Sequence, residues 1–267
     1  MAAVDTGRLA ERFGEVVARP ESELPLDEAA LLVSARFRPD LDLAAELGRL
    51  DDLAAGCVTP TLDGLVAHLF ADLGFAGNRV DYYDPRNSYL DQVVTRRLGI
   101  PISLAVLTMA VGRRIGVPLV GVGMPGHFLL RDRVDPEVFV DPFGAGRCLD
   151  AGACAAIFHA VHGAEAPFQP SYLAPIGPRL IVARMLANLR TIFAGQGDRP
   201  SLVAVLELHN RLPGASGEDR GELAAALAAS GRFGEAARQY DRASEQLGGT
   251  LGAEYRRNAE RLRARLN

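Results

Sequence analysis

The chain has 267 residues, of which 48% are hydrophobic and 23% charged, with a formal net charge of −4 at pH 7. This balance is ordinary for a globular protein that buries a core, and it lacks the basic excess expected of a nucleic-acid-binding protein. The longest apolar run, residues 101–111, is far shorter than the roughly 20 residues that a membrane-spanning helix needs.

The N-terminal sequence has no apolar signal core. The chain has three cysteines, which are too few and too scattered for a disulfide framework. We therefore expect a reduced, cytoplasmic protein with no nucleic-acid or membrane partner. Apolar stripes with helical spacing cover residues 31–37, 41–53 and 62–73, and Thr61 is a suitable N-cap for the third. His68 lies beside an apolar face, where a structural histidine is more common than a ligand.

The middle of the chain changes from helical to strand-like patterning. Residues 82–97 are predicted to form a turn and a short helix. Residues 101–114 are predicted to form a strongly apolar helix, with Pro101 in its first turn and Gly116 at its end. Three short strands are then predicted, within residues 117–124, 127–131 and 137–141.

The C-terminal part of the chain repeats itself. Placing Gly197 over Gly231 gives a period of 34 residues, which is the length of a tetratricopeptide repeat. Residues 253–266 are predicted to form a basic helix that caps the repeats. Such helical hairpins offer a groove for a protein or peptide partner, and Gly231 and Ala236 are expected at a close helix crossing.

His127 and Asp141 are predicted to face each other across a hairpin. A loop centred on Val134 pairs residues whose numbers sum to 268, so the two side chains would share one sheet face about 5 Å apart. A carboxylate at that distance can fix the tautomer of an imidazole. The alternative is an edge histidine beside an aspartate that caps a turn.

Three stretches carry a family resemblance: residues 87–104 (N-S-Y-L-D-Q-V-V-T-R-R-L-G-I-P-I-S-L), 125–131 (P-G-H-F-L-L-R) and 139–143 (F-V-D-P-F). Together they resemble the SirB-type bacterial family of the transglutaminase-like superfamily, whose papain-like core carries a Cys-His-Asp triad. The superfamily pattern has Gly-x-Cys at a helix start, an arginine and Gly-Ile-Pro near the helix end, then the histidine and an Asp-Pro. This chain matches that pattern in order and spacing at Gly99, Arg113, Gly116, His127 and Asp141.

The resemblance covers about residues 29–265 and implies an α+β fold in three parts. Residues 1–85 would form an N-terminal helical region that packs on the core. Residues 86–172 would form the transglutaminase-like core with a small antiparallel sheet. Residues 173–267 would form the tetratricopeptide-like helical region.

The chain departs from the pattern at the nucleophile. Pro101 occupies the cysteine position and offers no nucleophilic atom. Ser103 is the nearby hydroxyl, but two helical residues rotate it by roughly 200° from Pro101. A polar residue in a first helical turn more often bonds local backbone groups. Cys57, Cys148 and Cys154 lie outside the nucleophile position.

A metal site is a further alternative for residues 148–162. Cys154, His159 and His162 lie near one another in the sequence, but their spacing is not that of a structural zinc site. The spacing of Cys154, Phe158 and His162 is that of one half-buried helical stripe. We expect no metal and no cofactor.

We favour a catalytically degenerate transglutaminase-like protein, a pseudoenzyme acting as a regulatory or interaction scaffold, whose His127–Asp141 pocket binds a peptide segment or acyl group. The alternative is a hydrolase or acyltransferase that uses Ser103, His127 and Asp141, or a water activated by His127. A third reading makes the pair structural and the protein a repeat-type adaptor. The further candidate binding residues are Asn87, Arg97, Pro101 and Gly126.

Overall fold

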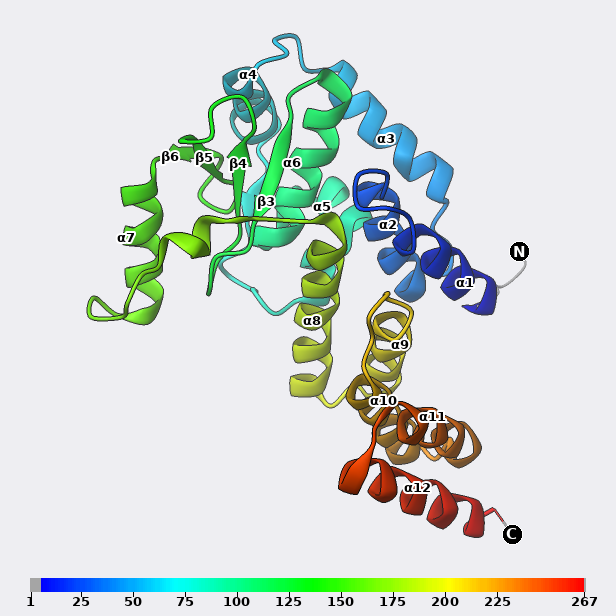
Figure 1. Cartoon of the computed structure of the whole chain (residues 1–267). Coiled ribbons are helices and arrows are strands. Elements are labelled where there is room, and N and C mark those ends of the chain that lie inside the picture. The colour runs from blue at the N-terminus through cyan, green and yellow to red at the C-terminus, as the bar shows by residue number, and fades with distance from the viewer. Residues whose placement is uncertain (1–5, 267) are drawn as a thin grey trace. The chain divides into compact units, whose positions relative to one another are not determined.

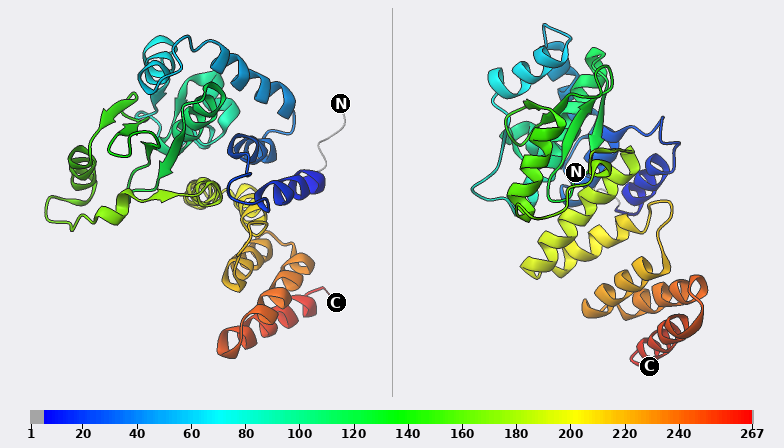
Figure 2. Two further views of the ribbon diagram at one scale, coloured as in Figure 1. Left: turned by 45° about the horizontal axis from the view of Figure 1, so that its top comes forward. Right: turned by 60° about the vertical axis from the view of Figure 1, so that its left-hand side comes forward.

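The computed structural model describes residues 6–266, which divide into two units (Figures 1 and 2). One unit runs from Pro20 to Met185. The other joins helix α1 (Thr6–Val17) to the residues from Leu186 onward. The domain boundaries expected at residues 85 and 172 stay predictions. No helix within residues 6–266 combines the length and the apolar character that crossing a membrane requires.

A five-stranded antiparallel sheet with strand order β6-β5-β4-β3-β7 belongs to the unit of residues 20–185. Its strands are β3 (Leu119–Val122), β4 (Leu129–Asp132), β5 (Phe139–Asp141), β6 (Arg147–Leu149) and β7 (Pro175–Ile176). The strands β3, β4 and β5 confirm the three predicted from the sequence. The two outer strands are only two or three residues long, and a proline begins β7, so no alternating pattern reveals them.

Helix α6 (Pro101–Ile115) is buried along most of its length. It contacts both β3 and β4, and Figure 1 shows it beside these strands. Its helical neighbours are α2 (Leu26–Phe37), α3 (Leu43–Ala55), α4 (Leu62–Val66) and α5 (Leu90–Arg96). Gly116 closes α6 with a φ of 80°, which confirms the predicted helix end, because glycine adopts this left-handed conformation without steric cost.

The N-terminal helices differ from the expected ones in their bounds. Helix α2 begins at Leu26, where Asp27 and Glu28 in its first turn favour a helix start. The segment after Thr61 is divided between α4 and a π-helical turn, η1 (Ala67–Asp72). The Thr61 hydroxyl accepts a hydrogen bond from Gly64 N at 3.2 Å, so the predicted cap is confirmed. The ring of His68 bonds the Leu53 carbonyl oxygen at 2.9 Å, as expected of a structural histidine.

A second, two-stranded sheet leads into α6. Its strands, β1 (Ala76–Gly77) and β2 (Leu98–Gly99), run parallel, and a short 3-10 turn, η2 (Pro85–Asn87), lies between them in the sequence. Helix α7 (Ala151–His162) and the 3-10 turn η3 (Pro170–Leu173) follow the large sheet. They close an apolar cluster with the strands, formed by Val122, Met124, Leu129, Phe139, Leu149, Cys154, Phe158 and Leu173.

The C-terminal residues form helical hairpins, as the sequence predicts. The helices are α8 (Pro178–Gln196), α9 (Arg199–His209), α10 (Gly217–Ala229), α11 (Phe233–Gln246) and α12 (Gly249–Ala264). Residues one period apart are equivalent, since both Leu189 and Leu223 are buried and both Gly197 and Gly231 have positive φ. The predicted capping helix is α12, which begins four residues before Ala253.

Ala236 is fully buried in the apolar cluster of these hairpins, as expected of a helix crossing. The same prediction for Gly231 is wrong. A Cβ atom at Gly231 would meet nothing within 4 Å, whereas the backbone there has a φ of +76°. Glycine is therefore needed at this position for the turn between α10 and α11, and not for close packing of helices.

Candidate functional site

His127 and Asp141 are in direct contact. Asp141 is the last residue of β5, and His127 lies two residues before β4, the neighbouring strand. The ring nitrogen Nε2 of His127 lies 2.8 Å from the Asp141 oxygen Oδ1. The predicted contact between the two side chains is therefore confirmed.

The register that produces this contact differs from the predicted one. Leu130 pairs with Val140 and Arg131 with Phe139, so the numbers of paired residues sum to 270 rather than 268. The loop is centred on Asp135, and the continued register places Leu129 opposite Asp141. A shift of two residues keeps every side chain on its predicted face, whereas a shift of one would have separated the pair. His127 reaches Asp141 diagonally, from two residues before the directly opposed position of Leu129.

The turn that follows β5 wraps around the Asp141 carboxylate. Phe143 N donates to Oδ1 at 3.1 Å, and Gly146 N donates to the Asp141 carbonyl oxygen at 2.9 Å. A Cβ atom at Gly144 would lie 2.4 Å from Oδ2, so only glycine allows the chain to pass this close.

These surroundings keep Asp141 ionised. Burial acts to raise the pKa of Asp141, but the hydrogen bond and charge of His127, the Gly144 N–H and the charge of Arg147 outweigh it, so the pKa is lowered. An ionised carboxylate can only accept, so His127 Nε2 carries the shared proton. His127 Nδ1 then presents a lone pair, and among residues 6–266 it has no hydrogen-bond partner. This nitrogen can accept a proton or a hydrogen bond from a bound group.

An aromatic wall adjoins the pair. The ring of Phe143 lies 6.2 Å from that of His127 at a steep angle, and Tyr82 meets Phe143 edge-on at 5.9 Å. The guanidinium of Arg79 lies over the ring of Phe143, 4.8 Å from the ring centre. Next to them, Val80 is fully exposed and the Tyr83 side chain is 64% exposed. The surface beside His127 is therefore largely apolar and exposed, and Arg79 adds a cation to it. Sequence patterning does not reveal this wall, because its residues come from two loops far apart in the chain.

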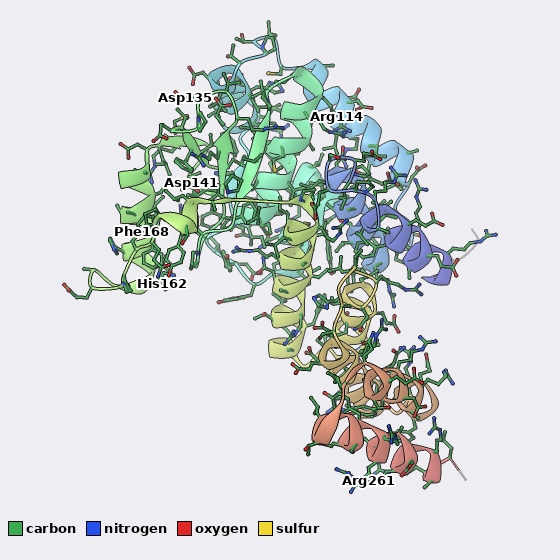
Figure 3. All side chains as sticks on the ribbon, in the orientation of Figure 1. Arg114, Asp135, Asp141, His162, Phe168 and Arg261 are labelled. Carbon is green, nitrogen blue, oxygen red and sulfur yellow. The ribbon has the colours of Figure 1, made fainter. Side chains whose placement is uncertain are left out.

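The end of α7 closes the other side of the turn that carries His127. Gly126 has a φ of +74°, and a Cβ atom there would lie 2.7 Å from Val161 Cγ1 and 2.8 Å from His162 Nε2. The glycine predicted to bind ligand thus provides close packing for α7. The His162 ring lies 4.5 Å from that of Phe158. Figure 3 shows His162 near Phe168 at this end of the helix, with Asp141 closer to the strands.

The structure does not bring Ser103 into the His127–Asp141 hydrogen bond. Ser103 is fully buried, and its hydroxyl lies 2.5 Å from the Asn87 carbonyl oxygen, to which it donates. The Ser103 hydroxyl oxygen accepts from Ile100 N at 3.1 Å. The hydroxyl therefore makes the local backbone bonds expected of a polar residue in a first helical turn.

Asn87 is fully buried and holds the loop before it. Its Nδ2 donates to the carbonyl oxygens of Asp81 and Tyr82, while Oδ1 accepts from Asn78 and Arg96. All hydrogen-bonding positions of the Asn87 side chain are thus engaged by the protein. This loop carries the Tyr82 ring of the aromatic wall, so Asn87 positions the wall by holding the loop.

Arg97 and Pro101 lie at the two ends of the segment that enters α6. Arg97 has a φ of 57° and ends α5, and its side chain is exposed beside a cavity that His68 also lines. Pro101 is buried at the first position of α6. A chain of contacts relates the start of α6 to the pair: Gly99 pairs with Gly77, and Gly77 lies against Phe143. Whether the helix start points at His127, as the resemblance implies, stays a prediction.

The three cysteines lie apart from the pair's hydrogen bonds. Cys154 is buried in the apolar cluster, and burial, with the charges of Asp150 and Asp141, raises its pKa to about 11. Cys148 is exposed, and its pKa is also raised, by partial burial and Asp63. Neither thiol is activated as a nucleophile, because the thiolate is the reactive form. Within the described residues no three acidic, histidine or cysteine side chains gather as metal ligands, and His159 bonds the Ala166 carbonyl oxygen instead.

Known proteins are similar to this chain in sequence. A family model described as the transglutaminase-like superfamily (Transglut_core2) matches residues 24–187. The UPF0162 protein of Xylella fastidiosa strain Temecula1 is 41% identical over 187 residues, which make up 65% of this chain and 66% of that protein. The UPF0162 protein PA3419 of Pseudomonas aeruginosa is 32% identical over 182 residues, again 65% of this chain and 66% of that protein. The match therefore spans just under two thirds of these relatives.

A shorter similarity links the chain to a mouse protein. F-box only protein 21 of Mus musculus is 43% identical over 102 residues, which make up 35% of this chain and 16% of that protein. No solved structure matches the chain.

Proposed function

The chain belongs to the transglutaminase-like superfamily, and on this basis we propose that it is a member without catalytic activity that binds a peptide segment at His127 and Asp141. One observation carries the proposal. The start of α6 offers Pro101 where the superfamily pattern places a cysteine, and the adjacent hydroxyl of Ser103 is buried and bonded to main-chain groups. Among the described residues, neither Pro101 nor Ser103 therefore offers a free side-chain nucleophile at the start of α6.

The surroundings of the pair suit a binding role. The Nδ1 atom of His127 can accept a hydrogen bond from a peptide N–H, and Phe143 and Tyr82 supply an apolar wall against which a side chain can pack. Arg79 adds a cation to the same wall. We propose that an extended segment of a partner protein lies along this wall. We also propose that the chain belongs to the SirB-type family within this superfamily. A further proposal is that the tetratricopeptide-like helices hold a protein partner.

The similarity to F-box only protein 21 supports the proposal that the matched segment is a module found in proteins of different overall architecture. The matched region makes up only 16% of that protein, so the same segment is found within a much larger chain. A binding surface can be reused in this way without any reaction in common.

Activation of a water molecule is the second candidate function. His127 Nδ1 has a lone pair and Asp141 would stabilise the imidazolium, which is the arrangement that a general base needs. A triad with Ser103 is disfavoured, because a nucleophile must lie within about 2.6–3.2 Å of the imidazole and the Ser103 hydroxyl is engaged elsewhere.

Two measurements separate these functions. For the binding function, we expect no labelling of Ser103 by a fluorophosphonate and no turnover of ester or amide substrates by the purified chain. Peptides selected from a random library should bind the wild type and lose affinity for His127→Ala. His209→Ala, in the C-terminal hairpins, serves as the matched control and should keep binding. Covalent labelling of Ser103 that His127→Ala abolishes would overturn the proposal.

A further inference from the structure

A cavity of about 380 Å³ lies in the same unit as the His127–Asp141 pair but at a separate place. It is bounded by the last turns of α6, the start of β3 and residues that precede α2 and α8. Leu119, in its wall, pairs with Asp132 at the end of β4, whereas His127 precedes the start of that strand. The cavity and the pair therefore lie at opposite ends of β4, roughly 15 Å apart along the strand.

The wall of this cavity is mostly apolar. Its apolar residues include Leu26, Met109, Ala110, Val117, Leu119 and Ile176. Four of them are only 5–9% exposed, so the cavity is lined by well-packed side chains. A space of this size and lining is at the lower end of small-molecule sites in proteins.

The carboxylates at the cavity are already neutralised. Asp27 is 3% exposed, and its Oδ2 accepts from Arg113 at 2.8 Å and from Arg114 at 2.6 Å. Glu21 pairs with Arg179 at 3.0 Å. Neither acidic group has charge left to attract a cation.

Two lining arginines keep unused donors. Arg113 contacts Asp27 through Nη2 only, and its side chain is 62% exposed. The exposed Arg133 has no ion-pair partner among residues 6–266. A guanidinium binds a carboxylate through two parallel hydrogen bonds, so these groups fit a carboxylate better than a cation or a neutral polar group.

We propose that this cavity binds a small monocarboxylate with an apolar tail, such as a medium-chain fatty acid. The carboxylate lies at Arg113 and Arg133, and the tail contacts the apolar wall. Among the described lining residues, only Arg113 and Arg133 keep free guanidinium donors at the cavity, and the rest of its wall is mostly apolar, so a single carboxylate fits better than an anion with several charges. The apolar wall disfavours small anions such as acetate, because they leave the wall unfilled.

The methionine residues provide a direct test. The chain has four methionines, of which Met109 lines the cavity, while Met124 directly precedes the Pro125–Gly126 turn that carries His127. Sodium octanoate should be titrated into the full chain labelled with ¹³C at the methionine methyl groups, with Met109→Leu used to assign its signal. We expect a saturable shift of the Met109 signal and no shift of the Met124 signal. An unchanged Met109 signal, or equal shifts of both signals, would contradict the proposal.

Charge substitutions complete the test. Arg133→Gln removes a donor that holds no other ion pair, so the fold should persist and the octanoate affinity should fall about tenfold. Arg257→Gln on α12 makes the same charge change away from the cavity and should leave the affinity unchanged. Octanol, which has the tail without the charge, and acetate, which has the charge without the tail, should each bind more weakly than octanoate. Equal affinity of Arg133→Gln and wild type for octanoate, or equal binding of octanol, would overturn the assignment.

Discussion

The Ser103 hydroxyl donates to the Asn87 carbonyl oxygen, 16 residues earlier in the chain, over 2.5 Å. It also accepts from Ile100 N, so one side chain joins the start of α6 to the loop before α5. In Ser103→Ala these buried main-chain groups lose that partner, and we expect the free energy of unfolding to fall by about 1–3 kcal/mol. Urea unfolding followed by circular dichroism measures this change.

Thr108 provides the control for this variant. It is also fully buried on α6, and its hydroxyl donates only to the Leu104 carbonyl oxygen at 2.8 Å. That carbonyl keeps its place in the helix in Thr108→Val, so the loss of stability should be smaller than in Ser103→Ala. If Ser103→Ala cost nothing, or abolished peptide binding without loss of stability, a structural role for Ser103 would be wrong.

Asp141→Asn should remove a pH-dependent part of the stability. The pKa of Asp141 is lowered in the folded chain. Its ionised form therefore stabilises the fold fully at pH values above the ordinary pKa of aspartate. That contribution is lost as the pH falls through the lowered pKa. The difference in unfolding free energy between wild type and variant should therefore be largest near neutral pH and decrease below about pH 4.

Denaturant unfolding at a series of pH values measures this difference. Asp135→Asn serves as the control, because Asp135 lies in the exposed loop of the same hairpin and its carboxylate accepts a local bond from Glu137 N. A difference for Asp141→Asn that stays constant across the series, or grows on acidification, would show that the carboxylate is not stabilised by His127.

Ala236→Leu should destabilise the C-terminal hairpins. Ala236 is fully buried among Leu223, Leu227 and the other members of its cluster, so a larger side chain overpacks the contact between α10 and α11. We expect a loss of about 1–3 kcal/mol in the free energy of unfolding. Ala225→Leu, on an exposed position of α10, should change it little. An unchanged unfolding midpoint for Ala236→Leu would argue against the tetratricopeptide-like packing.

The sequence predicts the helix at α6, the three central strands and the contact between His127 and Asp141. These predictions are correct because apolar periodicity and the helix end at Gly116 are local signals in the sequence. The hairpin register is wrong by two residues for a local reason as well. Asp132 accepts from Val134 N, and Asp135 accepts from Glu137 N, so two side-chain turns shift the centre of the loop to Asp135.

The surroundings of the pair depend on contacts between distant segments. Tyr82 meets Phe143 across 61 positions of the sequence, and Gly77 lies against the same ring. Asn87 was predicted to bind a ligand, but every hydrogen-bonding position of its side chain is occupied by the protein. A sequence motif marks a polar residue as important but does not show which segment of the chain it contacts. Those contacts become visible only in the folded structure.

The missing nucleophile is tested most directly by Pro101→Cys in a chain that also carries Cys148→Ser. A thiol at the first position of α6 would lie at a helix N-terminus, which lowers its pKa. If the start of α6 faces His127, as predicted, the imidazole would lower that pKa further, and iodoacetamide should alkylate the thiol rapidly at about pH 7. Cys148 of the wild-type chain is the reference, because burial raises its pKa and slows the same reaction. We predict alkylation of Cys at position 101 about tenfold faster than that of Cys148, and a return to the slower rate when His127→Ala is added. A rate no faster than that of Cys148, or one unaffected by His127→Ala, would contradict the account.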